Sequence, residues 1–580
     1  MNSSAAPKDE VSREEGTIAL IKDSITSIRH NAMRFLSGTA LSRVSGMVRD
    51  MVLAFAFGTH EAIAALFVAF RLSHVCRRLF GEGALQSAFI PLFEELRTEA
   101  PVRAFRFFRD LTVLLTLFLI SLVAVGMIGL GASLHFYEWS DKKREIIKLM
   151  IILLPSLIPI CLFGVNSALL QCQKHYFTAG IAPAFFNIII TIGALFLCRT
   201  EPTAAMPYLA VSIVLGCVMQ WLATFPATMR HMREGLKGQQ ANLSSMRHIR
   251  DFVIGQWTNV VQLFSLDIRR LGGPLALGFL GVGASQINNA VDTLFALRAD
   301  PEGPAQLWYG LRLLQLPLAL FGIAISGALL PPLSRSIQAG NEREYRYFME
   351  FALRRVTAFL LPCTVALYAF GTHIINAIYG RGDFQAHSVF TTSGCLHGYA
   401  LGLLPMGFII VLAPAFYAHK DFRAPTIGAI LSLLTNVVLD AFLVFVLQWG
   451  ALSVALATSI AAWINIAYLY KRLRIHSGNV LSDEGGQEFL KVIAVSISAG
   501  IATWFCQTYF FVPASFFNMY ANSSAALLPT DLFGQMLALA LPGCTFLACI
   551  ALFSYIINAQ DILNLFRKQK NIEKDIVIAK

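Results

Sequence analysis

The residues with the clearest chemical potential are arginines that lie inside long apolar stretches of the sequence. Arg43 and Arg49 lie in the first such stretch, Arg77 lies in the second, and Arg312 lies in a later one. An arginine at the centre of a bilayer costs roughly 2.5–3.5 kcal/mol, so these side chains are expected to face a wet cavity or an internal partner. Guanidinium groups bind phosphate or carboxylate through paired hydrogen bonds. The pattern therefore predicts a cavity that binds an anion.

Acidic residues near these arginines can balance only part of the positive charge. Asp50 follows Arg43 by two helical turns and shares its helix face, and Glu82 can pair with Arg78 one turn before it. Arg49 and Arg77 have no evident local partner in the sequence, so an excess of positive charge is expected in this region. The alternative is that the arginines reach the membrane surface from the helix ends or form internal ion pairs.

A second group of polar residues interrupts apolar stretches further along the chain. Asp292 lies in one stretch, Asn436 and Asp440 lie one helical turn apart in another, and Thr458 lies in the next. Carboxylate, amide and hydroxyl oxygens are the ligands that hard cations prefer, and two buried carboxylates need a cation or protons. Sodium and protons both fit this set. Separate polar contacts between helices are the alternative.

Helices that cross a membrane are the elements that must position these residues. Of the 580 residues, 56% are hydrophobic and 14% are charged, whereas soluble domains carry about 25% charged residues. Apolar runs of about 20 residues, long enough to span a bilayer as a helix, occur about 14 times. The alternation typical of a transmembrane barrel is absent from the sequence. The predicted fold class is an all-α integral membrane protein.

Short motifs that recur at one fixed offset predict two related halves, with chance matches in a low-diversity composition as the alternative. Two six-helix lobes are expected, related by a pseudo-two-fold axis along the membrane normal, with two further helices after them. The recurring pairs are Arg71-Leu72, Phe80-Gly81 and Pro91-Leu92, which return as Arg312-Leu313, Phe321-Gly322 and Pro332-Leu333. The expected segments are a polar tail (1–24), the first lobe (25–233), a linker (234–250), the second lobe (251–475), the last helix pair (485–560) and a basic tail (561–580).

Charge and motif content exclude several classes of function. The net charge of +11 follows the positive-inside bias, because basic residues gather in alternate loops, and this predicts that both termini are cytoplasmic. No basic and aromatic pattern of a nucleic-acid-binding protein is present. The ten cysteines show neither zinc-site nor disulfide spacing. Phosphate-binding loops and hydrolase motifs are also missing in any usable context, so a transporter is favoured over an enzyme.

Several segments closely resemble the MurJ/MviN family of lipid II flippases. The resemblance is carried by SRVSGMVRD at 42–50, FVAFRL at 67–72 and RRLFGEGA at 77–84, and continues through YGLRL at 309–313 and LAPAFY at 412–417. It implies the fold of the MOP exporters, with two lobes around a central cavity. It also implies that the last two helices form a groove for an undecaprenyl tail.

The resemblance implies a substrate, a site and a location. The substrate is lipid II, which is undecaprenyl-diphosphate-linked MurNAc-pentapeptide-GlcNAc, moved across the bacterial cytoplasmic membrane for cell-wall synthesis. A monomer is expected, which could associate with the synthesis machinery, and no cofactor is expected besides sodium. The implied cavity residues are Arg43, Arg49, Asp50, Arg77, Glu82 and Arg312, and the implied sodium ligands are Asp292, Asn436, Asp440, Thr458 and the backbone of Val454.

Three positions depart from the family pattern, because Ala64, Leu311 and Gln315 stand where acidic residues are common. Their absence leaves the expected cavity more positive and favours a diphosphate anchor over a proton relay. Two transporter alternatives remain, a flippase for another polyprenyl-linked saccharide and an ion-coupled exporter of the same fold. A membrane-embedded enzyme acting on polyprenyl phosphates is the alternative from another class.

Overall fold

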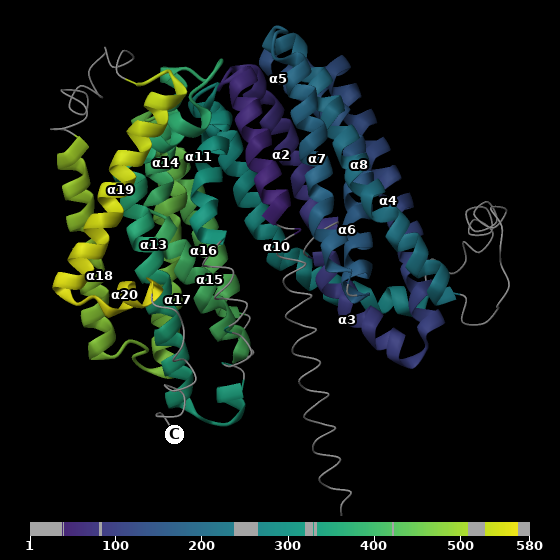
Figure 1. Ribbon diagram of the computed structural model, residues 1–580. Helices are drawn as coiled ribbons and strands as arrows, with labels where there is room; N and C mark the ends of the chain where they lie inside the picture. The colour runs from purple at the N-terminus through teal and green to yellow at the C-terminus, as the bar shows by residue number, and fades with distance from the viewer. Residues whose placement is uncertain are drawn as a thin grey trace, which may run out of the picture. The chain divides into compact units, whose positions relative to one another are not determined.

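The computed structural model describes residues 38–80, 84–236, 265–319, 335–507 and 528–566, and also positions 329 and 333. Within these ranges, positions 39, 174, 420 and 422 are not described. Throughout these ranges the regular elements are helices, which confirms the all-α prediction (Figure 1). Residues 40–57 form the first described helix. The others are α2 (Glu61–Phe80), α3 (Ala84–Glu99), α4 (Pro101–Phe136), α5 (Asp141–Leu153), α6 (Leu157–Cys172), α7 (Tyr176–Leu197), α8 (Pro202–Leu236), α10 (Leu266–Ala299), α11 (Gly303–Pro317), α13 (Glu342–Tyr379), α14 (Ala386–Ala400), α15 (Leu403–Ala418), α16 (Arg423–Phe442), α17 (Leu452–Ser477), α18 (Asp483–Cys506), α19 (Leu532–Ile557) and α20 (Gln560–Phe566).

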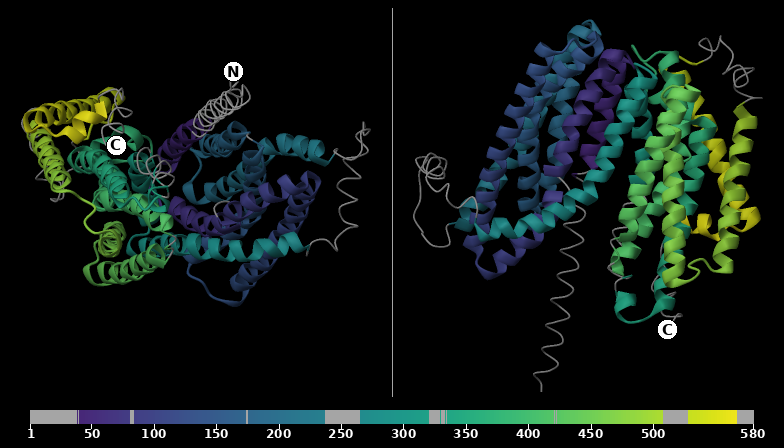
Figure 2. Two further views of the ribbon diagram at one scale, coloured as in Figure 1. Left: turned by 90° about the horizontal axis from the view of Figure 1, so that it is seen from below. Right: turned by 180° about the vertical axis from the view of Figure 1, so that it is seen from behind.

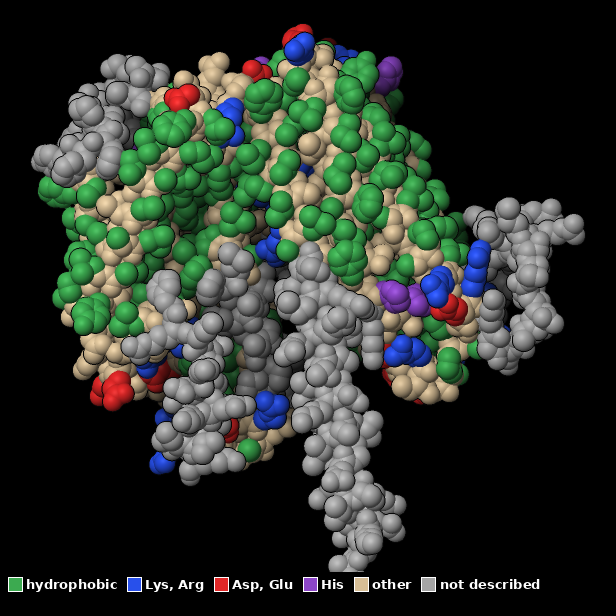
Figure 3. Space-filling model, viewed as in Figure 1, with side chains coloured by type: hydrophobic (Ala, Val, Ile, Leu, Met, Phe, Trp, Pro, Cys, Tyr) green, Lys and Arg blue, Asp and Glu red, His purple; other side chains and the backbone are tan. Residues whose placement is uncertain are grey.

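Most of these helices have the length and composition of membrane spans. Within the described ranges nine helices are long and apolar enough to cross a bilayer, and the bent pair α14 and α15 would make a tenth. Large apolar side chains such as Ile128 and Phe196 are exposed, at 72% and 85% of their surface. Figure 3 shows hydrophobic side chains over the outer helix faces, with charges mainly near the helix ends. The protein is therefore a multi-pass membrane protein, and the count of about 14 spans stays a prediction.

The first compact unit consists of Met1–Val52, Leu72–Thr200 and Ala204–Gly283. Its core contains stacked aromatic rings from α3 and α4, including Phe89 and Phe107 with centres 5.7 Å apart. The start of α10 is fixed to these helices by two ion pairs. Arg103 contacts Asp267 at 2.7 Å, and Arg270 contacts Glu95 at 2.7 Å.

The second compact unit consists of Leu53–Arg71, Glu201–Thr203 and Ala284–Lys580. Helices α18 and α19 pack against α13 through an apolar cluster that includes Val495, Phe546 and Ile550. The two helices lie beside each other in both views of Figure 2. Arg354 on α13 pairs with Asp561 on α20 at 2.8 Å, so the short last helix is also held against this unit.

Helices α2 and α10 are each divided between the two compact units, a division that the sequence repeat does not predict. Helix α2 belongs to the second unit as far as Arg71 and to the first unit after it, and α10 changes unit after Gly283. The repeat assigns each of these helices wholly to one lobe. A long helix can contribute to two cores because 20 residues span about 30 Å. The segment boundaries taken from the sequence stay a prediction.

A turn after the first helix interlocks with the loop between α13 and α14 inside the second unit. The amide of Asp383 donates to the carbonyl of Phe55 at 3.0 Å. Gly58 and Gly382 have φ of 53° and 61°, a region that favours glycine, and a Cβ on Gly58 would lie 2.3 Å from the carbonyl oxygen of Asp383. Both positions therefore require glycine for this close approach.

Candidate functional site

Arg49 is a buried arginine whose charge is met inside the first unit. Its Nε and Nη2 donate to Oδ1 of Asp50 at 3.0 and 2.6 Å, and its Nη1 donates to Oδ1 of Asn187 at 2.9 Å. Arg49 is 5% exposed and Asp50 is fully buried. Asp50 thus bonds to Arg49, the residue before it in the sequence. The sequence had indicated no partner for Arg49. A buried ion pair of this kind fixes local structure.

Asn187 on α7 is the residue of this site that the sequence analysis missed. Its Nδ2 donates to the carbonyl of Ser42 at 3.1 Å and to Oγ of Ser45 at 2.9 Å. It therefore joins α7 to the first helix and accepts from Arg49 at the same time. An amide in the middle of an otherwise apolar helix is a signal that could have found it, because buried amides need partners.

Of the other predicted cavity residues in the N-terminal half, the structure describes the side chain of Arg43 only. Arg43 is exposed on the first helix. Arg77 lies on α2, but its side chain and the whole of Glu82 lie outside the described residues. Arg312 belongs to the second unit. The single cluster of four arginines therefore stays a prediction, while the pairing of Arg49 with Asp50 is observed.

Arg312 lies against an aromatic ring on its own helix. Its guanidinium carbon lies 5.3 Å from the ring centre of Trp308, one turn earlier on α11, and that of Arg71 on α2 lies 5.5 Å from the same ring. Phe67 stacks on this indole, with centres 4.7 Å apart and planes 14° apart. The repeat that relates Arg71 to Arg312 also relates Phe67 to Trp308. Repeat-equivalent residues thus meet face to face, as expected for a two-fold related contact.

The predicted cation ligands come together in the second unit. Nδ2 of Asn436 donates to Asp292 at 2.5 Å and to Asp440 at 3.3 Å, and Thr458 donates to Asp292 at 3.3 Å. The hydroxyl of Thr458 also donates to the carbonyl of Val454 at 2.9 Å. Helices α10, α16 and α17 supply these residues, so spacing on one helix could not have shown that they meet.

Asn288 completes this cluster and was absent from the predicted ligands. It lies one turn before Asp292 on α10, donates to that carboxylate at 3.2 Å and accepts from Asn436 at 3.2 Å. Its place four residues before Asp292 could have indicated this contact, because residues four apart on a helix are neighbours.

Two oxygens of the cluster fit an additional positively charged group. Oδ1 of Asn436 and Oδ1 of Asp440 are buried, and no hydrogen-bond partner for either lies in the described part of the chain. Asp440 is fully buried and Asp292 is 7% exposed. Two carboxylates this deep repel each other unless a cation or a proton lies between them. The carboxylates, the Thr458 hydroxyl and the Val454 carbonyl offer oxygen ligands, which suit sodium, and the amide nitrogen of Asn436 faces both carboxylates in this structure.

A small cavity adjoins the carboxylate cluster. It has a volume of about 20 Å³ and is lined by Arg71, Asp292, Trp308 and Tyr399 among others. This is about the space that one water molecule or a small ion needs. Leu311, one of the three positions at which the family resemblance implies an acid, also lines it. Arg71 and Asp292 therefore present opposite charges to the same small space.

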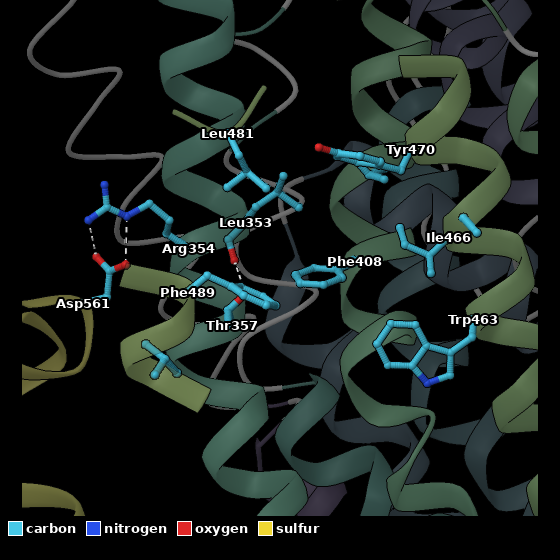
Figure 4. Close-up of a pocket in the computed structure, with 13 residues that line it drawn as sticks. Leu353, Arg354, Thr357, Phe408, Trp463, Ile466, Tyr470, Leu481, Phe489 and Asp561 are labelled. Atoms are coloured by element: carbon cyan, nitrogen blue, oxygen red, sulfur yellow. Dashed lines mark hydrogen bonds and ion pairs between the residues drawn. The ribbon is translucent and has the colours of Figure 1, made fainter. Parts of the chain in front are cut away.

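A larger apolar cavity of about 270 Å³ lies elsewhere in the second unit (Figure 4). Phe408, Trp463 and Phe489 point into it from α15, α17 and α18. The paired Arg354 and Asp561 lie at its margin. A cavity of this lining accepts hydrocarbon, because burying apolar surface is favourable.

The fold and these sites define a class of protein. Guanidinium and carboxylate groups inside membrane helices are typical of helical transporters, in which ionisable residues mark the path of substrates and ions. Nothing in the arrangement resembles a set of catalytic groups around a metal or a nucleophile in the described residues.

Comparison with known proteins identifies the family. The family model described as lipid II flippase MurJ matches residues 53–522, so this chain belongs to the MurJ family. It is 29% identical over 552 residues to the probable lipid II flippase MurJ of Chlamydia muridarum, covering 94% of this chain and 97% of that protein.

Two solved structures share the fold. One is lipid II flippase MurJ in an inward closed conformation, with a TM-score of 0.66, 23% identity, and coverage of 90% of this chain and 99% of that one. The other is an inward-facing multidrug resistance MATE family transporter of the MOP superfamily, with a TM-score of 0.58, 14% identity, and coverage of 77% and 98%. The expected MOP exporter fold is thereby confirmed.

Proposed function

We propose that this protein moves lipid II from the inner to the outer leaflet of the bacterial cytoplasmic membrane by alternating access. Membership of the MurJ family supports the substrate, since relatives across bacteria carry the name lipid II flippase. The observation that carries the mechanism is Arg312, a half-buried guanidinium on α11 with a second arginine against the same aromatic ring. Such a group attracts the diphosphate of a lipid-linked substrate.

The headgroup binds to the arginines in this proposal. Arg312, together with Arg43, Arg49 and Arg77, holds the diphosphate, and Asp50 and Glu82 limit the excess positive charge. Mutual repulsion of the arginines falls when the anion binds, and this difference between the states drives closure. Because Asp50 and Asn187 already bond to Arg49, Arg49 contributes less to diphosphate binding than Arg312 does.

The lipid tail stays in an apolar path in this proposal. The cavity in Figure 4 lies between α13, α15, α17 and α18, and α18 is the first of the two helices after the lobes. Its apolar lining suits isoprenyl groups, which gain roughly 0.8 kcal/mol for each buried methylene. The last helix pair (485–560) would thus contribute one wall of the tail groove.

Sodium is the cation that we propose for the carboxylate cluster. Asp292, Asp440, Thr458 and the carbonyl of Val454 supply oxygen, and a half-turn of the Asn436 amide would replace its donor by an acceptor. A bound cation would neutralise two buried carboxylates. The membrane potential adds about 2.3 kcal/mol per charge per 100 mV to any step that moves this charge across the bilayer.

Location and assembly complete the proposal. Both termini lie in the cytoplasm, the protein acts as a monomer, and it works beside the enzymes that make and use lipid II. Accessibility of single cysteines placed in the loops to a membrane-impermeant thiol reagent tests the orientation.

The test of the function is replacement of the native flippase in a depleted bacterium. Growth together with normal outer-leaflet lipid II is the expected result. Growth failure with an expressed, membrane-inserted chain would overturn it. Outer-leaflet accumulation of another polyprenyl-linked saccharide would favour that substrate, and sodium-driven efflux of a drug cation would favour an exporter. Sugar transfer or phosphate release by the purified protein would instead indicate an enzyme.

A further inference from the structure

The turn between α4 and α5, inside the first unit, presents exposed aromatic and basic side chains at the end of two membrane spans. Phe136 and Tyr137 are exposed over 77% and 68% of their surface. Three consecutive basic residues are exposed in the first turn of α5. The aromatic–basic patch consists of Phe136, Tyr137, Trp139, Lys142, Lys143 and Arg144.

The uncharged stretches on either side place this patch at the surface of the bilayer. Residues 111–134 and residues 149–173 contain no Asp, Glu, Lys or Arg. Each stretch is about 36 Å long as a helix, and the hydrocarbon core of a bilayer is about 30 Å thick. The helices Pro101–Phe136 and Asp141–Cys172 are both long and apolar enough to cross it. Residues 135–148 therefore lie at the depth of the lipid headgroups.

The contacts of Trp139 place its ring beside the basic residues. Its Nε1 donates to the carbonyl of Ser133 at 3.0 Å, which attaches the indole to the end of α4. Nζ of Lys143 lies 5.7 Å from its ring centre, and the ring centre of Tyr137 lies 6.0 Å away. Tryptophan and tyrosine are enriched at the membrane surface, because the ring is apolar and one end of it is polar. The patch thus combines interfacial rings with basic groups at one depth.

Exposed positive charge exceeds exposed negative charge in residues 135–148. Four basic residues are exposed against two acidic ones, and Glu145 is half-buried. The exposed residues are Lys142, Lys143, Arg144 and Lys148 against Glu138 and Asp141. The positive-inside bias keeps basic residues out of alternate loops, and the next loop on this side of the predicted topology, 198–201, contains only Arg199. The basic residues of the patch depart from that bias, and they are complementary to negatively charged headgroups.

We propose that the aromatic–basic patch binds the headgroups of anionic phospholipids, of which phosphatidylglycerol is the probe. Its rings lie among the glycerol groups and the first carbons of the acyl chains, and its basic side chains bind the phosphates. Binding fixes the depth at which the end of α4 and the start of α5 lie in the bilayer. The inference goes beyond the proposed function, because the patch shares no residue with the substrate site, the tail cavity or the cation cluster.

The test uses the full-length protein in lipid nanodiscs and the fluorescence of Trp139, taken as the difference between wild type and Trp139→Phe. Phosphatidylglycerol or phosphatidylcholine, brominated near the top of the acyl chains, is added to unlabelled phosphatidylcholine. Half-quenching is expected at an about fivefold lower mole fraction of the brominated phosphatidylglycerol. This preference should decrease at high salt, which screens exposed charges. The combined variant Lys142→Gln, Lys143→Gln, Arg144→Gln should lose the preference and keep quenching by phosphatidylcholine.

The matched control removes three exposed arginines at the opposite helix ends of the same unit, through Arg106→Gln, Arg230→Gln and Arg233→Gln. It should retain the preference for phosphatidylglycerol at Trp139. Equal quenching by both lipids in wild type, or an unchanged preference in the combined patch variant, would overturn the proposal. So would quenching of Trp139 by aqueous iodide and by neither lipid. If the combined variant fails to insert, Lys143→Gln and the salt dependence of wild type decide the matter.

Discussion

Arg49 and Arg312 are arginines whose described surroundings differ. Arg49 is 5% exposed and bonded to a carboxylate and an amide, whereas Arg312 is half-buried against the ring of Trp308. A carboxylate cancels the charge of a guanidinium, but an aromatic ring attracts it without cancelling it. The described contacts of Arg49 are therefore structural, whereas binding of a ligand by Arg312 is a proposal.

The carboxylates of the cation cluster differ from Asp50 in their bonding partners. Asp292 and Asp440 lie in the second unit, where asparagine and threonine side chains bond to them. Arg71 lines the small cavity beside Asp292. The two carboxylates of this cluster are thus bonded to neutral side chains, an arrangement that suits a bound cation.

The largest expected effect comes from removing the partner of Arg49. Asp50→Ala should lower the free energy of unfolding by about 3–5 kcal/mol, because it leaves a buried guanidinium without its carboxylate. Equilibrium unfolding of the purified protein in detergent measures the change. Adding Arg49→Met to this variant should restore much of the stability. If Asp50→Ala alone were as stable as wild type, the pair would have no structural role.

Removing the ligand-facing arginine should produce the opposite profile. Arg312→Ala should weaken pyrophosphate binding about 10- to 100-fold, which is the loss of a charge-assisted contact of about 1.5–3 kcal/mol. Its melting temperature should stay near that of wild type. Calorimetry and a melting curve on the same sample measure both quantities. A collapse in stability like that of Asp50→Ala would abolish the contrast between the two arginines.

Asn187 offers a milder test of the structural site. Asn187→Leu should cost about 1–3 kcal/mol, since Nη1 of Arg49 loses its acceptor. The control is Thr191→Val on the same helix, whose hydroxyl bonds only to the carbonyl of Asn187 in the described contacts. Comparison of their unfolding curves tests the assignment, and equal losses would show that α7 tolerates polar changes generally.

The smallest effect is expected for the cation cluster. Sodium should raise the melting temperature of wild-type protein by a few degrees relative to N-methyl-D-glucamine, through preferential binding to the folded state. Asp440→Asn should remove this shift. Asp110→Asn in the first unit, where Asp110 pairs with Arg109 at 2.7 Å, should retain it. A sodium shift that survives Asp440→Asn would place the cation elsewhere.

Sequence patterns reached some features of the sites and missed others for a physical reason. Asp292, Asn436, Asp440 and Thr458 could be named because each interrupts an apolar run. Asn187 was missed because its role depends on a contact 138 residues away in the chain. Trp308 was missed because an aromatic residue in an apolar helix is ordinary until its neighbours are known.

The sequence by itself determined that the protein lies in a lipid bilayer and that it is helical. It also determined which polar residues are costly to expose to lipid. These follow from composition and from runs of bilayer length, which are local properties. Tertiary structure alone decided which acid meets which arginine, and that α2 and α10 each serve two packed units. Those outcomes depend on contacts between residues far apart in the chain, and the spacing of residues on one helix contains no record of them.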